Sequence, residues 1–391
     1  MAVNGEPFFV KGAGGGRAHL EALASRGANA IRTWSTSEAG ALLDEAHAAG
    51  LMVLMGLRVV PERHGFDYDD ANAVARQLAS LSEEVRAYKD HPALLAWGIG
   101  NELNLRSENA SVWNAVNDIA AMIHDVDGNH PATTMLAGIR RPVVEAIADR
   151  AGELDFLCIQ MYGNIINARR LIADSGYEGP YLVTEWGATG HWEVSTTDWE
   201  APIEQTSSEK ADAILERYRA AILGDPERCM GSFVFLWGQK QERTPTWYGL
   251  FTEAGEQTEA IDVMQYVWTG SWPEHRAPRL TEVSVDGKGR YDNVRLNAGR
   301  RYTAAVSSDE EPGAPPSGLR VRAEVLPEAT ELGEGGDYEP RPSAVPGLID
   351  EVSPQSIVVR APSEPGPHRL FVYLLDAHGH AATANLPFLV E

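Results

Sequence analysis

The sequence predicts an α/β protein: a (β/α)8 barrel, the TIM barrel architecture, followed by a small all-β sandwich of immunoglobulin-like or fibronectin-like type. Between residues 8 and 269, short apolar runs alternate with helix-patterned segments, and eight such runs are present. After residue 278 the helix patterns stop, and short alternating stretches follow between Pro- and Gly-rich turns. A chain of 391 residues is long enough for both domains.

The eight barrel strands are predicted from runs rich in aliphatic and aromatic residues, as expected when both faces of a parallel sheet are covered. The runs are residues 8–13, 29–34, 51–60, 94–101, 132–137, 156–162, 181–185 and 231–237. Apolar residues at i, i+3 and i+4 predict helices between them, for example over 38–49 and 210–223. An open doubly wound sheet is the alternative, but the Gly-rich segment 12–17 lacks the third glycine of a phosphate-binding loop.

The domain boundaries follow from a change in composition. We expect the barrel over residues 1–270, a linker over 271–278 and the sandwich over 279–391, with strands at 302–306, 319–325, 356–359 and 368–375. The acidic segment 331–340 predicts a long surface loop, for which solvation is favoured over calcium binding. The sandwich has no Trp, so a spacer or a lid over the cleft is the interpretation we favour for it.

The composition narrows the partners and says less about location. A formal net charge of −23 argues against nucleic acid and against an anionic membrane surface. No apolar stretch approaches the roughly 20 residues of a membrane span. Cys158 and Cys229 lie in apolar runs and are expected to be buried free thiols. The first residues do not resemble a signal peptide; an extracellular or periplasmic location is favoured if a leader has been removed, and a cytoplasmic one stays open.

Chemically useful residues collect at the predicted strand ends, where a barrel has its active site. Two glutamates, Glu102 and Glu185, end apolar runs and are separated by 83 residues, the difference of 185 and 102. Two carboxylates that flank one bond suit glycoside cleavage. The other candidates at strand ends are Arg32, Trp34, Asn101, Tyr162, Trp186, Trp237 and Gln239.

At these positions the chain resembles the clan A glycoside hydrolases, which are retaining β-glycosidases built on (β/α)8 barrels. The pattern of the clan is an Asn-Glu pair at the end of strand four and a second Glu at the end of strand seven, matched here by Asn101-Glu102 and Glu185. The resemblance covers residues 8–269. It implies that Glu102 is the general acid and then the base, and that Glu185 is the nucleophile.

The resemblance also implies roles for three neighbours. Asn101 would bind the sugar 2-hydroxyl, Tyr162 would contact the nucleophile, and Trp237 would form a sugar platform. From the residues themselves, we expect Arg32 to keep Glu185 ionised while apolar surroundings hold the proton on Glu102. As further substrate contacts we expect Trp34, Trp186 and Gln239.

The favoured function is therefore a retaining hydrolase of a β-glucan or a related β-linked oligosaccharide. A transglycosylase that uses the same two acids is the first alternative, and a non-catalytic sugar-binding barrel is the second. The long segments 186–208 and 238–255 are expected to wall the cleft, with further Trp side chains for sugar subsites. No cofactor or metal is expected, because the one close His pair, His378 and His380, lacks further ligands, and a Gly-x-Ser-x-Gly motif is absent.

Overall fold

The structure is a computed structural model that describes residues 1–308 and 318–391. The chain divides into two compact units. The first comprises Met1–Trp186 and Arg217–Trp237, and the second comprises Gly187–Glu216 and Gly238–Glu391. The segments that follow the seventh and eighth barrel strands thus belong to the same unit as the C-terminal sandwich. The boundaries that we expect at residues 270 and 278 stay a prediction.

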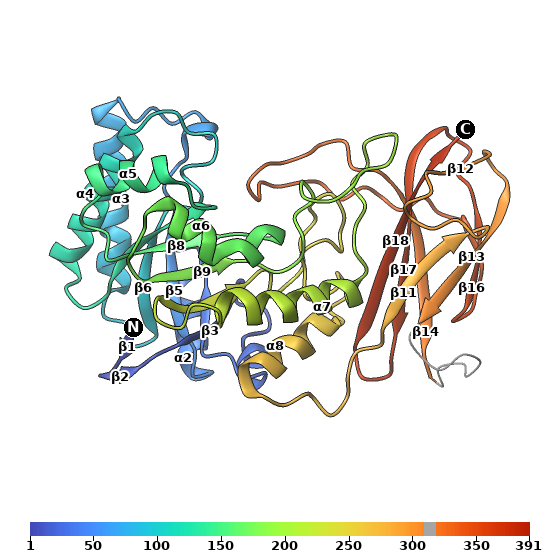
Figure 1. The fold of residues 1–391 in the computed structure, drawn as a ribbon, viewed down its shortest axis with the longest axis horizontal. Helices are drawn as coiled ribbons and strands as arrows, with labels where there is room; N and C mark the ends of the chain where they lie inside the picture. Colours follow the sequence, from blue (N-terminus) through green and yellow to red (C-terminus); the bar gives the residue numbers. More distant parts are fainter. Residues whose placement is uncertain (309–317) are drawn as a thin grey trace. The chain divides into compact units, whose positions relative to one another are not determined.

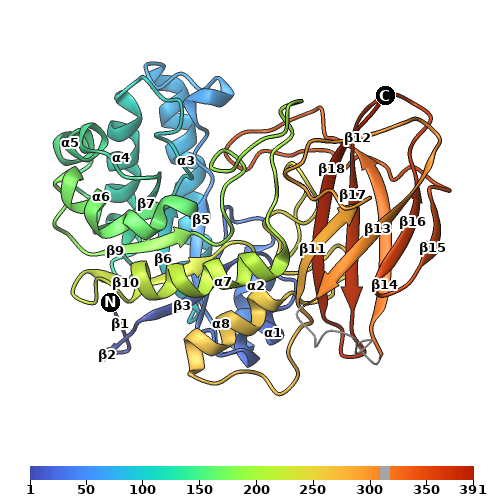
Figure 2. The same ribbon diagram turned by 45° about the vertical axis from the view of Figure 1, so that its right-hand side comes forward.

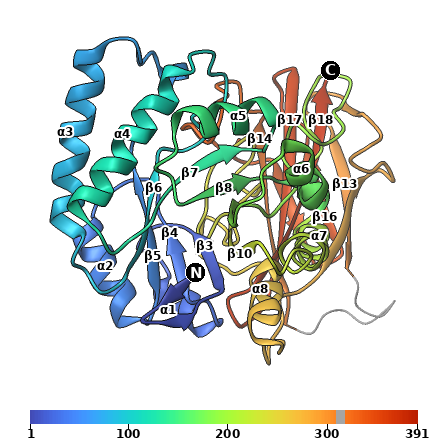
Figure 3. The same ribbon diagram turned by 60° about the vertical axis from the view of Figure 1, so that its left-hand side comes forward.

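The first unit contains a closed parallel barrel with the strand order β10-β3-β4-β5-β6-β7-β8-β9 (Figures 1 and 3). Its strands are β3 (Val10–Gly14), β4 (Ala30–Arg32), β5 (Met52–Leu57), β6 (Leu94–Ile99), β7 (Ala132–Ala137), β8 (Phe156–Gln160), β9 (Tyr181–Glu185) and β10 (Cys229–Val234). All eight predicted strands are confirmed. Every residue of β6 is buried, which explains why the apolar runs show little alternation.

Helices connect the barrel strands, and a short hairpin of β1 (Ala2–Val3) and β2 (Glu6–Pro7) precedes β3. The helices of this unit are α1 (Leu20–Ser25), α2 (Ala39–Ala48), η1 (Glu62–His64), α3 (Ala71–Tyr88), α4 (Ser111–Val126), α5 (Arg141–Arg150), η2 (Gly163–Asn167), α6 (Ala168–Ser175) and η3 (Tyr218–Ile222). The predicted helix over 38–49 is α2. Helix α3 begins where the Asp70 carboxylate accepts hydrogen bonds from the backbone of Asn72 and Ala73.

The second unit combines helices α7 (Ser207–Arg217) and α8 (Glu259–Thr269) with a sandwich of two sheets (Figure 2). One sheet has the order β11-β13-β16-β15 and the other β12-β18-β17-β14. The strands are β11 (Leu280–Val285), β12 (Val294–Leu296), β13 (Arg301–Ser308), β14 (Arg320–Pro327), β15 (Ile349–Val352), β16 (Ser356–Arg360), β17 (Gly366–Leu375) and β18 (Ala381–Val390). The four predicted sandwich strands correspond to β13, β14, β16 and β17.

The sandwich core is built from aliphatic side chains of both sheets, among them Leu280, Val359 and Leu386. Strands β17 and β18 pair over ten residues, from Gly366 opposite Val390 to Leu375 opposite Ala381. Within the sandwich, strand pairing is antiparallel except between β12 and β18, which are parallel. Across residues 1–308 and 318–391, no helix combines the length and the apolar character that a membrane crossing requires.

Candidate active site

The C-terminal ends of four barrel strands meet around the carboxylate of Glu185. Arg32 ends β4, Gln160 ends β8 and Glu185 ends β9, while Asn101 and Glu102 follow β6 closely. This edge of the sheet is where a (β/α)8 barrel has its active site. Direct hydrogen bonds link five of the predicted site residues: Arg32, Trp34, Asn101, Tyr162 and Glu185.

Within the described residues, the Glu185 carboxylate accepts four hydrogen bonds. Its Oε1 accepts from Arg32 Nη1 at 2.8 Å, from Trp34 Nε1 at 2.8 Å and from Gln160 Nε2 at 3.0 Å. Its Oε2 accepts from the Tyr162 hydroxyl at 3.0 Å. All four partners are donors, as a deprotonated carboxylate requires. Arg32 is fully buried and Glu185 is 6% exposed, so this ion pair is stabilised by protein groups rather than by water.

The position of Gln160 beside Glu185 depends on an irregularity of the sheet. Between β8 and β9, Ile159 lies opposite Val183, but the next pair is Gln160 opposite Glu185, so the register shifts by one residue. A shift of this kind changes which side chains share a face. Gln160 thereby donates to Glu185, a contact that the sequence analysis missed although this residue lies near the end of the predicted run 156–162.

Asn101 shares two of the donors that hold Glu185. Its Oδ1 accepts from Arg32 Nη2 at 2.6 Å and from Gln160 Nε2 at 2.8 Å. Because both partners are donors, the network assigns this atom as the amide oxygen. The NH₂ group of Asn101 therefore points away from Arg32 and Gln160. In this orientation it can donate to a further acceptor.

Glu102 lies in a tightly held turn after β6. Its φ of 50° is in the left-handed region, which costs a non-glycine residue roughly 1–2 kcal/mol. Its backbone N–H donates to Met135 O at 3.0 Å, and Asn104 exchanges two hydrogen bonds with the backbone of Ala137. The surrounding strand β7 thus maintains the strained turn. The Glu102 residue itself is 9% exposed.

Three aromatic residues surround the Glu185 carboxylate. The ring of Phe235, which directly follows β10, meets the ring of Trp34 edge-on at 5.8 Å and the ring of Tyr162 edge-on at 6.1 Å. The Arg32 guanidinium lies 4.9 Å from the centre of the Trp34 ring. Phe235 is thus the eighth-strand aromatic that packs on the site; the run 231–237 contained it, but nothing in the sequence distinguished it from Trp237.

The remaining candidates are Trp237, Trp186 and Gln239. Trp237 is almost fully buried and donates from Nε1 to His19 O at 3.1 Å. Trp186 is fully buried, with its ring 5.8 Å from that of Tyr218. Gln239 belongs to the second unit and donates to Pro245 O at 2.9 Å. The substrate-binding roles of these three residues stay predictions, and the burial of the two indoles gives them no support.

Cysteine and metal chemistry have little support among the described residues near Glu185. Burial raises the pKa of the Cys158 thiol, in β8, to about 12, so this side chain is a poor nucleophile at neutral pH. Cys229 is buried as well, and both cysteines are free. In the described part of the chain, no cluster of three or more His, Cys, Asp or Glu residues could hold a metal ion.

Several solved structures of known proteins are similar to this chain in fold. No protein-family model matches this chain, and neither does any curated protein. Among solved structures, a β-glucuronidase from Ruminococcus gnavus in complex with uronic deoxynojirimycin matches 68% of this chain and 50% of its own, with 15% identity and a TM-score of 0.54. Bacteroides uniformis β-glucuronidase 2, covalently bound to cyclophellitol-6-carboxylate aziridine, matches 99% of this chain and 46% of its own, with 13% identity and a TM-score of 0.52.

The chain is similar to these proteins in fold. A β-D-glucuronidase from Dictyoglomus thermophilum also matches, with 16% identity and a TM-score of 0.52 over 69% of this chain and 53% of its own. The chain spans about half the length of these structures. At such low identity the likeness concerns architecture, so any activity must be argued from the residues around Glu185.

Proposed function

We propose that this chain is a retaining β-glycosidase that acts on β-linked oligo- or polysaccharides by double displacement. One observation carries the proposal: the Glu185 carboxylate ends the seventh barrel strand, is held by four donors, and shares two of them with Asn101, the neighbour of Glu102. Retaining cleavage needs one carboxylate as nucleophile and a second carboxyl group as acid and then base.

Glu185 takes the role of nucleophile, with Oε2 as the attacking atom. Oε1 already accepts three hydrogen bonds, whereas Oε2 accepts one, from Tyr162. A lone pair engaged by a donor is a weaker nucleophile, so the less engaged oxygen attacks the anomeric carbon. Arg32 and Trp34 fix the carboxylate plane during this step, and the Tyr162 hydroxyl orients the attacking atom.

Glu102 takes the role of acid and base. In the first step it protonates the departing glycosidic oxygen, and in the second it removes a proton from the attacking water. Formation of the glycosyl ester removes the negative charge of Glu185 before the second step.

Asn101 supplies a donor to the sugar. Its Oδ1 is held by Arg32 and Gln160, so its NH₂ group is oriented to donate to a sugar hydroxyl. A hydrogen bond to the 2-hydroxyl strengthens as the oxocarbenium-like transition state forms. In this way the donors that hold the nucleophile also hold the group that recognises the substrate.

The structural neighbours support the chemistry without specifying the sugar. The neighbours described above are named β-glucuronidases, and the Bacteroides uniformis protein is covalently bound to an aziridine. A covalent adduct on a protein of the same fold agrees with nucleophilic catalysis. Glucuronides therefore join glucans, mannans and galactosides as substrates to be tried.

Chemical rescue tests the two roles separately. The chain is first screened against 4-nitrophenyl β-glycosides, including the β-glucuronide, and against β-linked glucans and mannans. On a cleaved 4-nitrophenyl substrate, E102A is expected to be rescued by azide with a β-glycosyl azide as product. E185A is expected to give the α-glycosyl azide, since azide then attacks from the face of the missing carboxylate.

Two controls make the result decisive. Asp44→Asn removes an exposed carboxylate of α2 and should leave turnover at the wild-type level. Proton NMR of the first-formed product should show retained β configuration. Wild-type turnover by E185Q, or a product of inverted configuration, contradicts the proposal.

A further inference from the structure

Trp192 is an exposed aromatic residue on a segment that begins directly after the seventh barrel strand and Trp186. Its side chain is 60% exposed, the largest value for a Trp in the described residues. It belongs to the second unit, in the segment 187–216. A single exposed apolar residue needs no special explanation on its own. The contacts that hold Trp192 in place do need an explanation.

A closed turn fixes the backbone of Trp192. The residue is third in a four-residue turn in which Glu193 N donates to Gly190 O at 2.9 Å. The Glu193 side chain closes the turn a second time, because its Oε2 accepts from Gly190 N at 2.9 Å. These two hydrogen bonds between Gly190 and Glu193 make the turn rigid.

The indole also lies directly against the backbone of Gly190. A Cβ atom at Gly190 would be 2.6 Å from Trp192 Cε2 and 2.7 Å from Cζ2, too close for any real contact. The glycine is therefore required for the present position of the ring. One side of the Trp192 ring packs against Gly190. The solvent-exposed part of the ring is therefore an apolar surface that is held in a fixed position.

Polar groups lie beside this surface. The His191 ring meets the Trp192 ring edge-on at 4.8 Å, and His191 Nε2 is 3.6 Å from Glu242 Oε1. Glu242 Oε2 accepts from Lys240 Nζ at 2.7 Å. Burial acts to raise the pKa of Glu242, but His191 and Lys240 outweigh it and hold the pKa below its usual value. Glu242 is thus a buried, charged partner of His191, the residue beside Trp192.

The turn is tied to the segment 238–257 of the same unit. Trp247 Nε1 donates to Thr189 O at 2.9 Å, and the Tyr248 hydroxyl accepts from His191 N at 3.3 Å. Both aromatic residues are almost fully buried. The backbone on each side of Gly190 therefore has a rigid partner.

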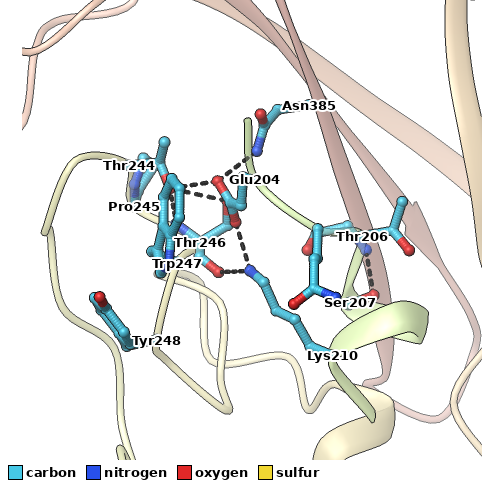
Figure 4. Close-up of polar contacts among 12 residues, drawn as sticks. Glu204, Thr206, Ser207, Lys210, Thr244, Pro245, Thr246, Trp247, Tyr248 and Asn385 are labelled. Atoms are coloured by element: carbon cyan, nitrogen blue, oxygen red, sulfur yellow. Dashed lines mark hydrogen bonds and ion pairs between the residues drawn. The ribbon is translucent and has the colours of Figure 1, made fainter. Parts of the chain in front are cut away.

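A buried polar network in turn anchors both segments to the sandwich (Figure 4). Glu204 lies at its centre and accepts from Lys210, from two threonines of the segment 238–257, and from Asn385 of β18. Lys210 Nζ also donates to Thr246 O at 2.7 Å. The backbone that carries Trp192 is thus fixed through two layers of contacts.

We propose that Trp192 forms a platform for one sugar ring of a β-linked oligosaccharide. The apolar C–H face of a pyranose stacks on an indole. The choice of sugar as the occupant rests on the proposed function. The platform itself is built from residues of the second unit alone.

Trp272 shows what an exposed Trp without this role looks like. It is 37% exposed, in the same unit, but its ring stacks on Tyr266 at 4.3 Å and has the Arg276 guanidinium 3.9 Å from its centre. Protein groups already occupy its π surface. It is therefore a matched control for the removal of an exposed indole.

Calorimetric titration tests the platform. The full chain carrying E185Q, which prevents cleavage, is titrated with β-1,4-gluco-, β-1,3-gluco- and β-1,4-manno-oligosaccharides of two to six units. In the series that binds, W192A is expected to weaken binding of the hexasaccharide about tenfold. W192F should recover part of the affinity, and G190A should weaken binding although Trp192 is retained.

The controls separate this inference from the proposed function. W272A should bind as the parent protein does, and thermal unfolding checks that each variant is folded. Equal affinity of W192A and W272A, or no binding of any series by the parent, overturns the platform. Binding that depends on Trp192, together with no cleavage of any β-glycoside by the wild-type chain, supports the platform and contradicts the glycosidase proposal.

Discussion

Glu185 and Glu204 are two buried glutamates with nearly the same surroundings and different hydrogen-bond patterns. Each accepts from one cationic side chain and three neutral donors within the described residues. The donors to Glu185 are Arg32, Trp34, Gln160 and Tyr162. The donors to Glu204 are Lys210, Thr244, Thr246 and Asn385. The number of donors therefore does not separate a candidate catalytic carboxylate from a structural one.

What separates them is how the donors are shared between the two oxygens. Each oxygen of Glu204 accepts two hydrogen bonds, whereas Oε1 of Glu185 accepts three and Oε2 accepts one. An evenly engaged carboxylate is a good cross-link. An unevenly engaged one is held firmly while one oxygen keeps lone-pair density for a reaction. We expect mutations to affect turnover at Glu185 and stability at Glu204.

The largest expected effect is on turnover. E185Q should lower kcat at least about 10⁴-fold on any cleaved glycoside, because an amide cannot form the glycosyl ester. E204Q should lower kcat less than tenfold, since Glu204 contacts loops and β18 rather than the reacting atoms. The measurement is the initial rate at saturating substrate for both variants, and similar losses in the two would remove the distinction.

The next effect is on the free energy of unfolding. K210M leaves the Glu204 carboxylate buried without its cationic partner, and a change of this kind costs about 3–5 kcal/mol. Urea denaturation followed by circular dichroism measures it. The matched control is the exposed pair of Arg170 and Asp174: R170M should change stability by less than about 1 kcal/mol. If K210M lowered the free energy of unfolding as little as R170M does, Glu204 would not act as a cross-link between these segments.

Acid pH should weaken the Glu204 network in particular. Burial opposes ionisation, but Lys210, the Thr244 hydroxyl and Arg369 outweigh it and hold the pKa of Glu204 below its usual value of 4.5. A lowered folded-state pKa stabilises the protein above the unfolded-state pKa, and that contribution is lost as the pH falls through the folded-state value. The free energy of unfolding of wild type should therefore drop below about pH 4.5, relative to E204Q, which cannot be protonated. Parallel pH curves for the two proteins would contradict this assignment.

The sequence predicted much of the site because barrel strands have a strong apolar signal and the active site lies at a known edge. Arg32, Asn101, Tyr162 and Glu185 were identified from strand ends alone, and the structure brings them together. The position of a strand end does not give the direction of a side chain, however. Trp237 is buried and donates from its indole to His19 O, whereas the ring of Phe235, two residues earlier, packs edge-on against Trp34.

Two features lay beyond the reach of pattern analysis. The register shift between β8 and β9, which places Gln160 beside Glu185, arises from pairing between strands and leaves no mark in either one. Glu204 lies in a segment without helix or strand periodicity, and its partner Asn385 is 181 residues away in β18. Contacts at such separation depend on the folded arrangement of both segments. Strand β18 itself is rich in Ala and includes Asn, so its β pattern was weak.

The removal of one hydroxyl from each carboxylate gives the smallest and most closely matched comparison. Y162F deletes the hydrogen bond to Glu185 Oε2, and T244V deletes a hydrogen bond to Glu204 Oε2 with little change of shape. A hydrogen bond to a charged group contributes about 1.5–3 kcal/mol. We expect Y162F to lower kcat about ten- to hundredfold with little change in the unfolding midpoint in urea. T244V should destabilise the fold by about that free energy and leave kcat near the wild-type value. If Y162F instead destabilised the protein and left kcat intact, the single donor on Oε2 would be structural, and the asymmetry of Glu185 would lose its catalytic meaning.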